Sequence, residues 1–293
     1  MLAGLLAAGH SVRVLARDPA AARKRLENAG VQGASPLVEF AAGDVVTGAG
    51  LDAGMAGCQA VVHLVGIIME VKGATFDQSH RQATINVVEA ARRQRMSRYV
   101  HMSALGARPD GVSGYQTSKW AAEEAVRASG IPFVILRPSI IFGPRDGFVT
   151  QMVQVMKTAP FVRPVPGHGR YRFRPVYVGD VVECFLQSLT SDRALGRAIE
   201  LVGPDEITLA EMLAIIAECV GVKKPAVKVP FALMYMNAAL LQTILPRPPV
   251  STDQLRMLRE GSTADPGPML DTFKLNPTGF RQGLNKYLCR LQG

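Results

Sequence analysis

The hydrophobic and polar positions of the first half of the chain follow two alternating periods. Short runs rich in β-branched residues are separated by longer stretches in which apolar residues recur at helical spacing. The short runs, each predicted to be a strand, are 11–16, 37–44, 60–66, 98–103 and 132–138. The predicted helices between them include 19–30, 75–94 and 114–129. The run 60–66 is almost continuously apolar, which is typical of a strand buried on both faces.

This alternation predicts an α/β fold with a Rossmann-like, doubly wound parallel sheet and helices on both of its faces. Ligands of such sheets bind at the carboxyl ends of the strands, so the residues that follow each strand are candidates for binding. We predict a dinucleotide-binding domain over 1–160. A smaller, mixed but mainly helical substrate or partner region follows over 161–293, with some segments returning to the first domain.

The pattern loosens after about residue 145, and the remaining predicted elements depend on capping signals. A strand over 174–178 precedes a helix for which Asp180 is the expected N-cap. Thr208 and Glu211 form a capping-box signature, and Gly221 ends the helix that follows them. The longest apolar stretch, 229–245, is shorter than the ~20 residues that a membrane-spanning helix needs. We predict a buried helix there, with a helix on a membrane surface as the alternative.

Composition excludes several classes of protein. The four cysteines contain no C-x-x-C pair and no Cys/His cluster with zinc spacing, so we predict buried free thiols, no metal site and a reducing, cytoplasmic location. The net charge of +9 suits a phosphate-bearing ligand or an acidic partner surface. No nucleic-acid-binding motif accompanies that charge, so we predict no nucleic-acid partner.

The beginning of the sequence lacks an expected feature. It opens within a helical pattern, LAGLLAAGH, and passes directly into the strand 11–16. A dinucleotide-binding sheet normally begins with a strand and a glycine-rich turn whose backbone approaches the pyrophosphate, and no G-x-x-G-x-x-G is present. Because the absent strand is central in the doubly wound order, its loss is costly. We therefore expect a late start codon or a truncated gene model.

Several segments together resemble the extended short-chain dehydrogenase/reductase superfamily, which is NAD-dependent epimerase/dehydratase-like. They occur in the order of that superfamily and cover almost the whole chain. They are SVRVLARDP, FAAGDV, AVVHLVGII, RYVHMSALGA, YQTSK, ILRPSIIFGP, RPVYVGDV and IELVGPDEIT. The segments HMSALGA, RPSIIFGPRDGF and PVYVGDV are most similar to the atypical branch that includes the 39-kDa subunit of respiratory complex I. The resemblance implies an NAD(P)-binding protein.

The resemblance implies a set of residues on the adenosine side of the cofactor. Arg17 follows the second strand of the superfamily, where an arginine suits the 2′-phosphate of NADP and an acidic residue would suit NAD. We therefore favour NADP(H) over NAD(H). Asp18 beside it leaves a plain surface turn as the alternative. Asp44 and the backbone amide of Val45 fall where the superfamily holds the adenine.

Further positions fall on the nicotinamide side. Val65 and Gly66 end a strand, and a glycine there lets the backbone approach the cofactor ribose. Pro138 and Ser139 fall where the backbone of the superfamily meets the nicotinamide amide.

Tyr115 and Lys119 form a Y-x-x-x-K pair on one face of a predicted helix. The lysine ammonium can lower the pKa of the tyrosine, which could then exchange a proton while the nicotinamide passes a hydride. The resemblance also has Lys119 holding the nicotinamide ribose, and Ser103 hydrogen-bonding the substrate oxygen.

The histidines include the main departure from the superfamily. His80 stands where active members carry an asparagine of the catalytic tetrad, so it either replaces that residue or the proton relay is lost. His63 and His101 lie in predicted strands, and we expect both to be core histidines. His168 lies in a basic loop that suits a phosphorylated substrate or a docking surface.

Two functions remain open. The first is an accessory or assembly protein of respiratory complex I with NADP(H) as a bound ligand. The second is an active oxidoreductase or nucleotide-sugar epimerase/dehydratase that uses Tyr115 as acid and base. The first implies a respiratory or other protein partner, at most peripheral membrane association, and a place at the inner face of the respiratory membrane.

Overall fold

The computed structural model describes the chain except residues 32–34, 247 and 290–293. Its helices are α1 (Leu2–Ala7), α2 (Pro19–Asn28), α3 (Leu51–Met55), η1 (Asp77–Gln82), α4 (Ala83–Arg93), α5 (Gly114–Arg127), α6 (Gly147–Thr158), α7 (Val178–Thr190), η2 (Asp192–Ala194), α8 (Leu209–Cys219), α9 (Phe231–Ile244), α10 (Thr252–Glu260), α11 (Gly267–Thr272) and α12 (Phe280–Tyr287). Its strands are β1 (Val12–Ala16), β2 (Val38–Ala42), β3 (Ala60–His63), β4 (Arg98–Met102), β5 (Phe133–Pro138), β6 (Ile141–Phe142), β7 (Arg163–Pro166), β8 (Arg172–Phe173), β9 (Val176–Tyr177), β10 (Ala198–Leu201), β11 (Ile207–Thr208) and β12 (Ala226–Val229).

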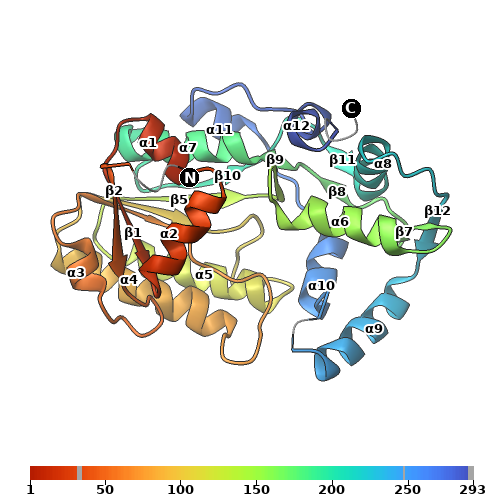
Figure 1. The fold of residues 1–293 in the computed structure, drawn as a ribbon, viewed down its shortest axis with the longest axis horizontal. Helices are drawn as coiled ribbons and strands as arrows, with labels where there is room; N and C mark the ends of the chain where they lie inside the picture. The colour runs from red at the N-terminus through yellow and green to blue at the C-terminus, as the bar shows by residue number, and fades with distance from the viewer. Residues whose placement is uncertain (32–34, 247, 290–293) are drawn as a thin grey trace.

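The parallel strands confirm the predicted α/β class. Four of them form one sheet in the order β10-β5-β4-β3, and β1 pairs with β2 separately. The register places Val100 of β4 opposite Val62 of β3 and Val134 of β5. Within the described residues, β1 and β3 do not pair, so the strands of the predicted first domain form two parallel groups. Helices cover both faces, with α4 and α5 on one side and α1, α7 and α11 on the other (Figure 1).

The four-stranded sheet is buried on both faces. Tyr99 and Val100 of β4 and Ile135 of β5 have no exposed surface. Val100 packs in a cluster with residues of α7, whereas Tyr99 and Ile135 pack in a second cluster with residues of α4. A strand covered on both sides is mainly apolar, as 133–136 of β5 is, while the His101 side chain of β4 is also buried.

The predicted helix over 75–94 forms with an irregular first half. It opens as the π-helix η1 and continues as α4. Such wide turns are rare and occur often at functional sites, and this one carries His80. The departure from a regular helix was not visible in the apolar spacing.

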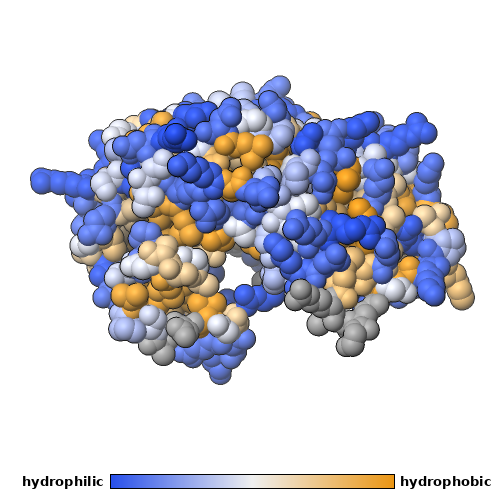
Figure 2. Space-filling model, turned by 90° about the horizontal axis from the view of Figure 1, so that it is seen from above, coloured by the Kyte–Doolittle hydropathy of each residue, from blue (hydrophilic) through white to orange (hydrophobic). Residues whose placement is uncertain are grey.

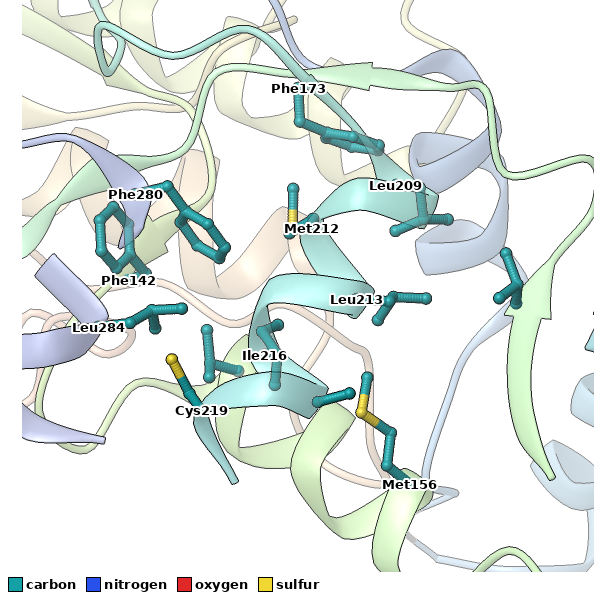
Figure 3. Packing of buried hydrophobic residues seen from close by; sticks show 13 residues of the cluster. Phe142, Met156, Phe173, Leu209, Met212, Leu213, Ile216, Cys219, Phe280 and Leu284 are labelled. Carbon is teal, nitrogen blue, oxygen red and sulfur yellow. The ribbon is translucent and has the colours of Figure 1, made fainter. Parts of the chain in front are cut away.

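The C-terminal part has a core of its own. The capping box of Thr208 and Glu211 is confirmed, and α8 ends just before Gly221, whose φ of 68° is left-handed. Figure 3 shows the cluster around α8, to which several elements contribute. Its fully buried members include Phe142, Phe173, Leu209, Met212, Ile216, Phe280 and Leu284. The boundary at residue 160 stays a prediction, and β10 beside β5 belongs to the main sheet.

The prediction that Asp180 caps a helix is wrong. Helix α7 begins two residues earlier, with Tyr177 at its N-cap. The Asp180 carboxylate instead accepts hydrogen bonds from the backbone N–H of Thr278, at 2.6 Å, and from the Thr278 hydroxyl, at 3.2 Å. A tertiary partner about a hundred residues away therefore uses the group that the local pattern assigned to the helix end.

The prediction of free thiols is wrong for two of the four cysteines. Cys219 at the end of α8 and Cys289 after α12 form a disulfide, with a sequence separation of 70. Cys58 and Cys184 are free. Spacing along the chain gives no sign of the pair, because packing of α12 against α8 brings the two positions together. The expected reducing compartment, which rested on free thiols, loses that support.

The predicted buried helix in the apolar stretch 229–245 is also wrong. Helix α9 forms there, but only Ala238 among its residues is buried. Its large apolar side chains include Met236, which is 66% exposed, and Ile244, which is 64% exposed. Within the described part of the chain, no helix combines the length and apolar character that crossing a membrane requires.

Candidate functional site

The predicted site residues gather around helix α5 and the carboxyl ends of the neighbouring strands. Gly66 follows β3, Ser103 follows β4, and α5 packs against β5. Helix α5 begins where it does because the Ser113 hydroxyl accepts a hydrogen bond from the backbone N–H of Gln116, at 3.2 Å. This cap fixes the first turn of the helix, which carries Tyr115.

The backbone of Gly66 closely approaches two of these side chains. A Cβ atom added at Gly66 would lie 2.9 Å from Lys119 Nζ and 3.2 Å from His80 Nε2. A side chain at this position would require the Lys119 ammonium to move. Lys119 Nζ donates to the backbone carbonyl of Met102, at 3.1 Å. Burial lowers the pKa of Lys119 to about 8, although the nearby Glu123 acts in the opposite direction.

Tyr115 lies beside the same group. Its ring meets the rings of His80 and Phe76 edge to face, with centroids 5.4 and 5.9 Å away. Among the described residues, its phenol oxygen has no hydrogen-bond partner in the protein. Burial raises the pKa of Tyr115 to about 12. The expected lowering of this pKa by Lys119 is not seen, and the Lys119 ammonium donates to the Met102 carbonyl.

His80 is held on both ring nitrogens. Its Nε2 accepts a hydrogen bond from the backbone N–H of Ile67, at 3.0 Å. Its Nδ1 lies 2.8 Å from Ser118 Oγ, which donates its own proton to the Tyr115 carbonyl. Nδ1 must therefore be the donor, and the ring is neutral. Burial and the charge of Lys119 lower the pKa of His80 to about 3.

The sequence analysis missed the buried partner of Ser103. The hydroxyl of Ser103 donates to Glu123 Oε1, at 2.5 Å, and Glu123 is completely buried. Glu123 also accepts bonds from Arg137, at 2.7 and 2.6 Å, and from Arg127, at 2.6 Å. One signal was available, because Glu123 lies four residues beyond Lys119 on the same helix face. The action of Ser103 on a substrate stays a prediction.

On the adenosine side, Arg17 is exposed, and no hydrogen bond or ion pair involves it within the described residues. Its neighbour Asp18 caps α2 by accepting from the backbone N–H of Ala21, at 2.9 Å. The carboxylate of Asp18 therefore has a structural partner, whereas the guanidinium of Arg17 is available to a ligand.

Asp44 and Val45 form a local turn. Asp44 Oδ1 accepts from the backbone N–H of Val46, at 2.8 Å. Asn86 Nδ2 donates to the carbonyl of Val45, at 2.9 Å. The turn is thus fixed to α4, and the second carboxylate oxygen of Asp44 has no partner among the described residues.

On the nicotinamide side, Val65 is 42% exposed and Gly66 is exposed, whereas Pro138 is buried at the end of β5. The hydroxyl of Ser139 lies 2.9 Å from that of Ser262. This contact joins the end of β5 to the C-terminal region, and no local sequence pattern predicts it.

Of the remaining histidines, two lie in the core as expected, and the third lies in the basic loop. His63 and His101 are confirmed as core residues, at 3% and 1% exposure. Burial lowers the pKa of both, so both rings are neutral. His168 stacks on Tyr171 in the basic loop, with ring centroids 4.2 Å apart.

Two arginines after this loop, Arg172 and Arg174, both pair with Glu206. Their charge is thus partly neutralised. Among the described residues, no group of three or more His, Cys, Asp or Glu side chains could hold a metal ion.

The fold and this set of residues define a dinucleotide-binding protein. The model of the NAD dependent epimerase/dehydratase family matches residues 1–201, and the chain belongs to that family. The fold is similar to the UDP-glucuronic acid 4-epimerase of Bacillus cereus, solved with UDP-glucuronic acid and NAD. That likeness has a TM-score of 0.74 at 15% identity and covers 98% of this chain and 93% of the epimerase. The predicted resemblance is therefore confirmed.

Two curated relatives differ in what their names describe. The chain is 32% identical to NADH dehydrogenase (ubiquinone) 1 alpha subcomplex subunit 9, mitochondrial, of Arabidopsis thaliana, over 63% of this chain. It is 30% identical to the 4-hydroxy-2-methyl-3-oxo-4-farnesyl-3,4-dihydroquinoline-1-oxide ketoreductase of Stigmatella aurantiaca, over 84% of this chain and 78% of the relative. The match covers 46% of the plant subunit, so the chain spans about half of that protein.

Proposed function

We propose that this protein is an NADP(H)-binding accessory or assembly protein that works beside a respiratory complex. One observation carries this proposal: Ser103 and His80, which would complete a catalytic tetrad with Tyr115 and Lys119, both bond to the protein itself. Ser103 donates its proton to Glu123, and neither ring nitrogen of His80 is left to organise a water. The proton of Ser103 and both ring nitrogens of His80 are thus engaged within the protein, which supports a role in the fold over a role in turnover, while the Ser103 oxygen keeps acceptor capacity.

The residues of the site fit a dinucleotide. The exposed backbone at Val65 and Gly66, with Lys119 beside it, suits a ribose, and we assign Pro138 and Ser139 at the end of β5 to the nicotinamide amide. On the other side, Asp44 and Val45 suit the adenine. A ligand that binds only the folded state stabilises it by RT ln(1 + [L]/Kd), which is about 2.7 kcal/mol when the ligand is a hundredfold above Kd.

Arg17 supports NADP(H) over NAD(H), because its guanidinium is exposed while Asp18 is engaged in a helix cap. The test is a thermal-shift titration of the protein isolated from its source cells with NADPH and with NADH. We expect a larger shift with NADPH. Arg17→Ala should weaken NADPH binding by at least about tenfold, the loss of one charge-assisted contact, and should leave NADH binding unchanged. Equal responses to both cofactors in both proteins would contradict the NADP(H) assignment.

Similarity to subunits of mitochondrial NADH dehydrogenases supports a respiratory partner and a place at the inner, cytoplasmic face of the respiratory membrane. The test is to resolve solubilised membranes on a native gel and to follow this chain by mass spectrometry. We expect it to migrate with NADH dehydrogenase activity. Migration as a free protein under conditions that keep the complex intact would refute the association.

A second candidate function is reduction of a carbonyl compound. The free phenol of Tyr115 and the similarity to a ketoreductase across most of the chain favour it. Tyr115 holds a proton on its phenol oxygen and can donate it to a carbonyl oxygen, while Lys119 fixes the local geometry. A reduced nicotinamide would supply the hydride when bound.

Tyr115→Phe separates the two functions, because it removes the transferable proton and keeps the ring packing against His80 and Phe76. If the variant complements a deletion strain as well as wild type, while Lys119→Ala fails, then binding suffices without chemistry. Failure of Tyr115→Phe, with cofactor binding retained, would favour the reductase.

A further inference from the structure

Helix α9 carries apolar side chains on the face that points away from the protein. Leu233, Met236, Leu240 and Ile244 are 46%, 66%, 59% and 64% exposed. Their spacing of three, four and four residues places them in one stripe along the helix. The stripe extends for roughly 16 Å at the rise of an α-helix. Figure 1 shows α9 at the edge of the molecule, beyond α10.

The opposite face of α9 already has its partners. Phe231 meets Tyr171 edge to face, at 5.4 Å between ring centroids, and Ala238 is buried. Gln242 Oε1 accepts a hydrogen bond from the backbone N–H of Thr252, at 3.0 Å, which joins α9 to α10. The helix is therefore anchored by one face, and its exposed stripe is left over after the fold has formed.

The segment that carries the stripe is basic, and α10, which packs on α9, brings Asp253, Arg256 and Arg259 near Tyr235. Residues 219–252 contain no Asp or Glu, and their four basic residues are Lys223, Lys224, Lys228 and Arg247. Lys224 donates to three backbone carbonyls at the end of α6. Lys223 and Lys228 are exposed, and no ion pair within the described residues involves them. An apolar helix flanked by unpaired lysines is complementary to an anionic bilayer surface.

We propose that α9 is an interfacial helix that inserts Leu233, Met236, Leu240 and Ile244 among the acyl chains of an anionic membrane, with Lys223 and Lys228 at the headgroups. The stripe contains only aliphatic and thioether side chains and offers no hydrogen bond to a protein partner. Protein hot spots are instead enriched in Trp, Tyr and Arg. This inference goes beyond the proposed function and rests on the exposed face of α9 together with the exposed Lys223 and Lys228 that precede it.

Docking in this way would also set the place of the site relative to the membrane. Helix α10, on which α9 packs, is joined to the start of α5 by two hydrogen bonds. Asp253 of α10 accepts from the backbone N–H of Gly114, at 3.2 Å, and Glu260 accepts from Gln116 Nε2, at 2.6 Å. One helix therefore separates the bilayer from the helix that carries Tyr115.

The test is co-sedimentation of the full-length protein with vesicles of phosphatidylcholine alone and of phosphatidylcholine mixed with phosphatidylglycerol. We expect wild type to bind the mixed vesicles and the double variant Met236→Gln/Leu240→Gln to bind at least about tenfold more weakly. Lys223→Gln/Lys228→Gln should lose severalfold in affinity for the mixed vesicles and nothing for the neutral ones. The matched control is Leu270→Gln, which alters a 41% exposed leucine on α11 and should bind as wild type does.

Two outcomes would overturn the proposal. One is that wild type stays in the supernatant with both kinds of vesicle, and the other is that the double variant sediments as well as wild type. A self-association that depends on concentration and is lost in the double variant, without vesicle binding, would assign the stripe to a second copy of this chain. Circular dichroism and the Tm of each variant confirm that folding is unchanged.

Discussion

Helices α5 and α9 each have 14 residues, and they relate polarity to burial in opposite ways. Helix α5 buries Gln116, Lys119 and Glu123 and has a side-chain cap at Ser113. Helix α9 has no side-chain cap and no charged residue, and it exposes aliphatic side chains such as Leu240.

The difference lies in where the side chains of each helix find their partners. The polar groups of α5 can be buried because each finds a partner within the chain, such as Arg137 for Glu123 and the Met102 carbonyl for Lys119. The apolar groups of α9 are exposed in the described structure, and we propose that a membrane surface covers them.

The largest effect should follow from removing the charge that α5 buries. Glu123→Ala would leave Arg137 and Arg127 without their buried partner and Ser103 without its acceptor. We expect a loss of about 3–5 kcal/mol in the free energy of unfolding, measured by urea denaturation. The exposed neighbour Glu124, whose pair with Arg127 is a surface ion pair, is the control, and Glu124→Ala should cost less than about 1 kcal/mol. Similar losses for both variants would contradict the comparison.

The next effect concerns acid stability. The pKa of His80 lies at about 3 in the folded protein, below its ordinary value of 6.5. Between these two pH values the unfolded chain binds a proton that the folded one does not, so stability is lost as pH falls through this window. Each such histidine contributes about 1.4 kcal/mol per pH unit. His80→Gln should flatten the slope by that amount in urea denaturation at several pH values. Parallel curves for the two proteins would show that His80 is protonated in the fold.

A smaller effect of the same sign, in a more alkaline pH window, follows from Lys119. Burial lowers its pKa from 10.5 to about 8, so the unfolded chain binds more protons between these values. Wild-type stability should therefore gain about 1–3 kcal/mol from this lysine as pH rises from 8 to 10. Lys119→Met should lack that gain, whereas the exposed Lys228→Met should keep it. Urea denaturation at both pH values measures the difference.

The smallest effect is expected on the outer face of α9. Met236→Gln should change the free energy of unfolding by no more than about 0.5 kcal/mol, because the side chain leaves no cavity and loses no partner. Leu213→Ala in the core around α8 is the contrasting variant and should cost about 2–5 kcal/mol. A large loss of stability in Met236→Gln would mean that the stripe packs within this protein.

The sequence predicted the elements of the parallel sheet well and the partners of single side chains poorly. The strands 60–66 and 98–103 were found because short β-branched and aromatic runs alternate with helical patterns along the chain. The local capping box of Thr208 and Glu211 was found because both partners lie within one turn. The cap at Asp180 was wrong because Thr278, far along the chain, binds that carboxylate.

For the candidate site, too, the sequence predicted some features and missed others. The pairing of Tyr115 with Lys119 on one helix face, and the glycine beside them, follow from spacing and order in the chain. The pKa values and hydrogen-bond partners of these side chains do not follow from spacing and order. Burial raised the pKa of Tyr115 to about 12, and the acceptor of Lys119 proved to be the backbone of another strand.

The sequence by itself thus determined the α/β class, the order of the elements, the family and the residues that end each strand. These features depend on periodicity and on contacts between near neighbours. Only the tertiary structure decided that Cys219 joins Cys289, that Glu123 holds Ser103, and that α9 turns its apolar side outward. Each of these depends on which distant segment packs beside a residue. The hydropathy pattern along the chain does not indicate which segment that is.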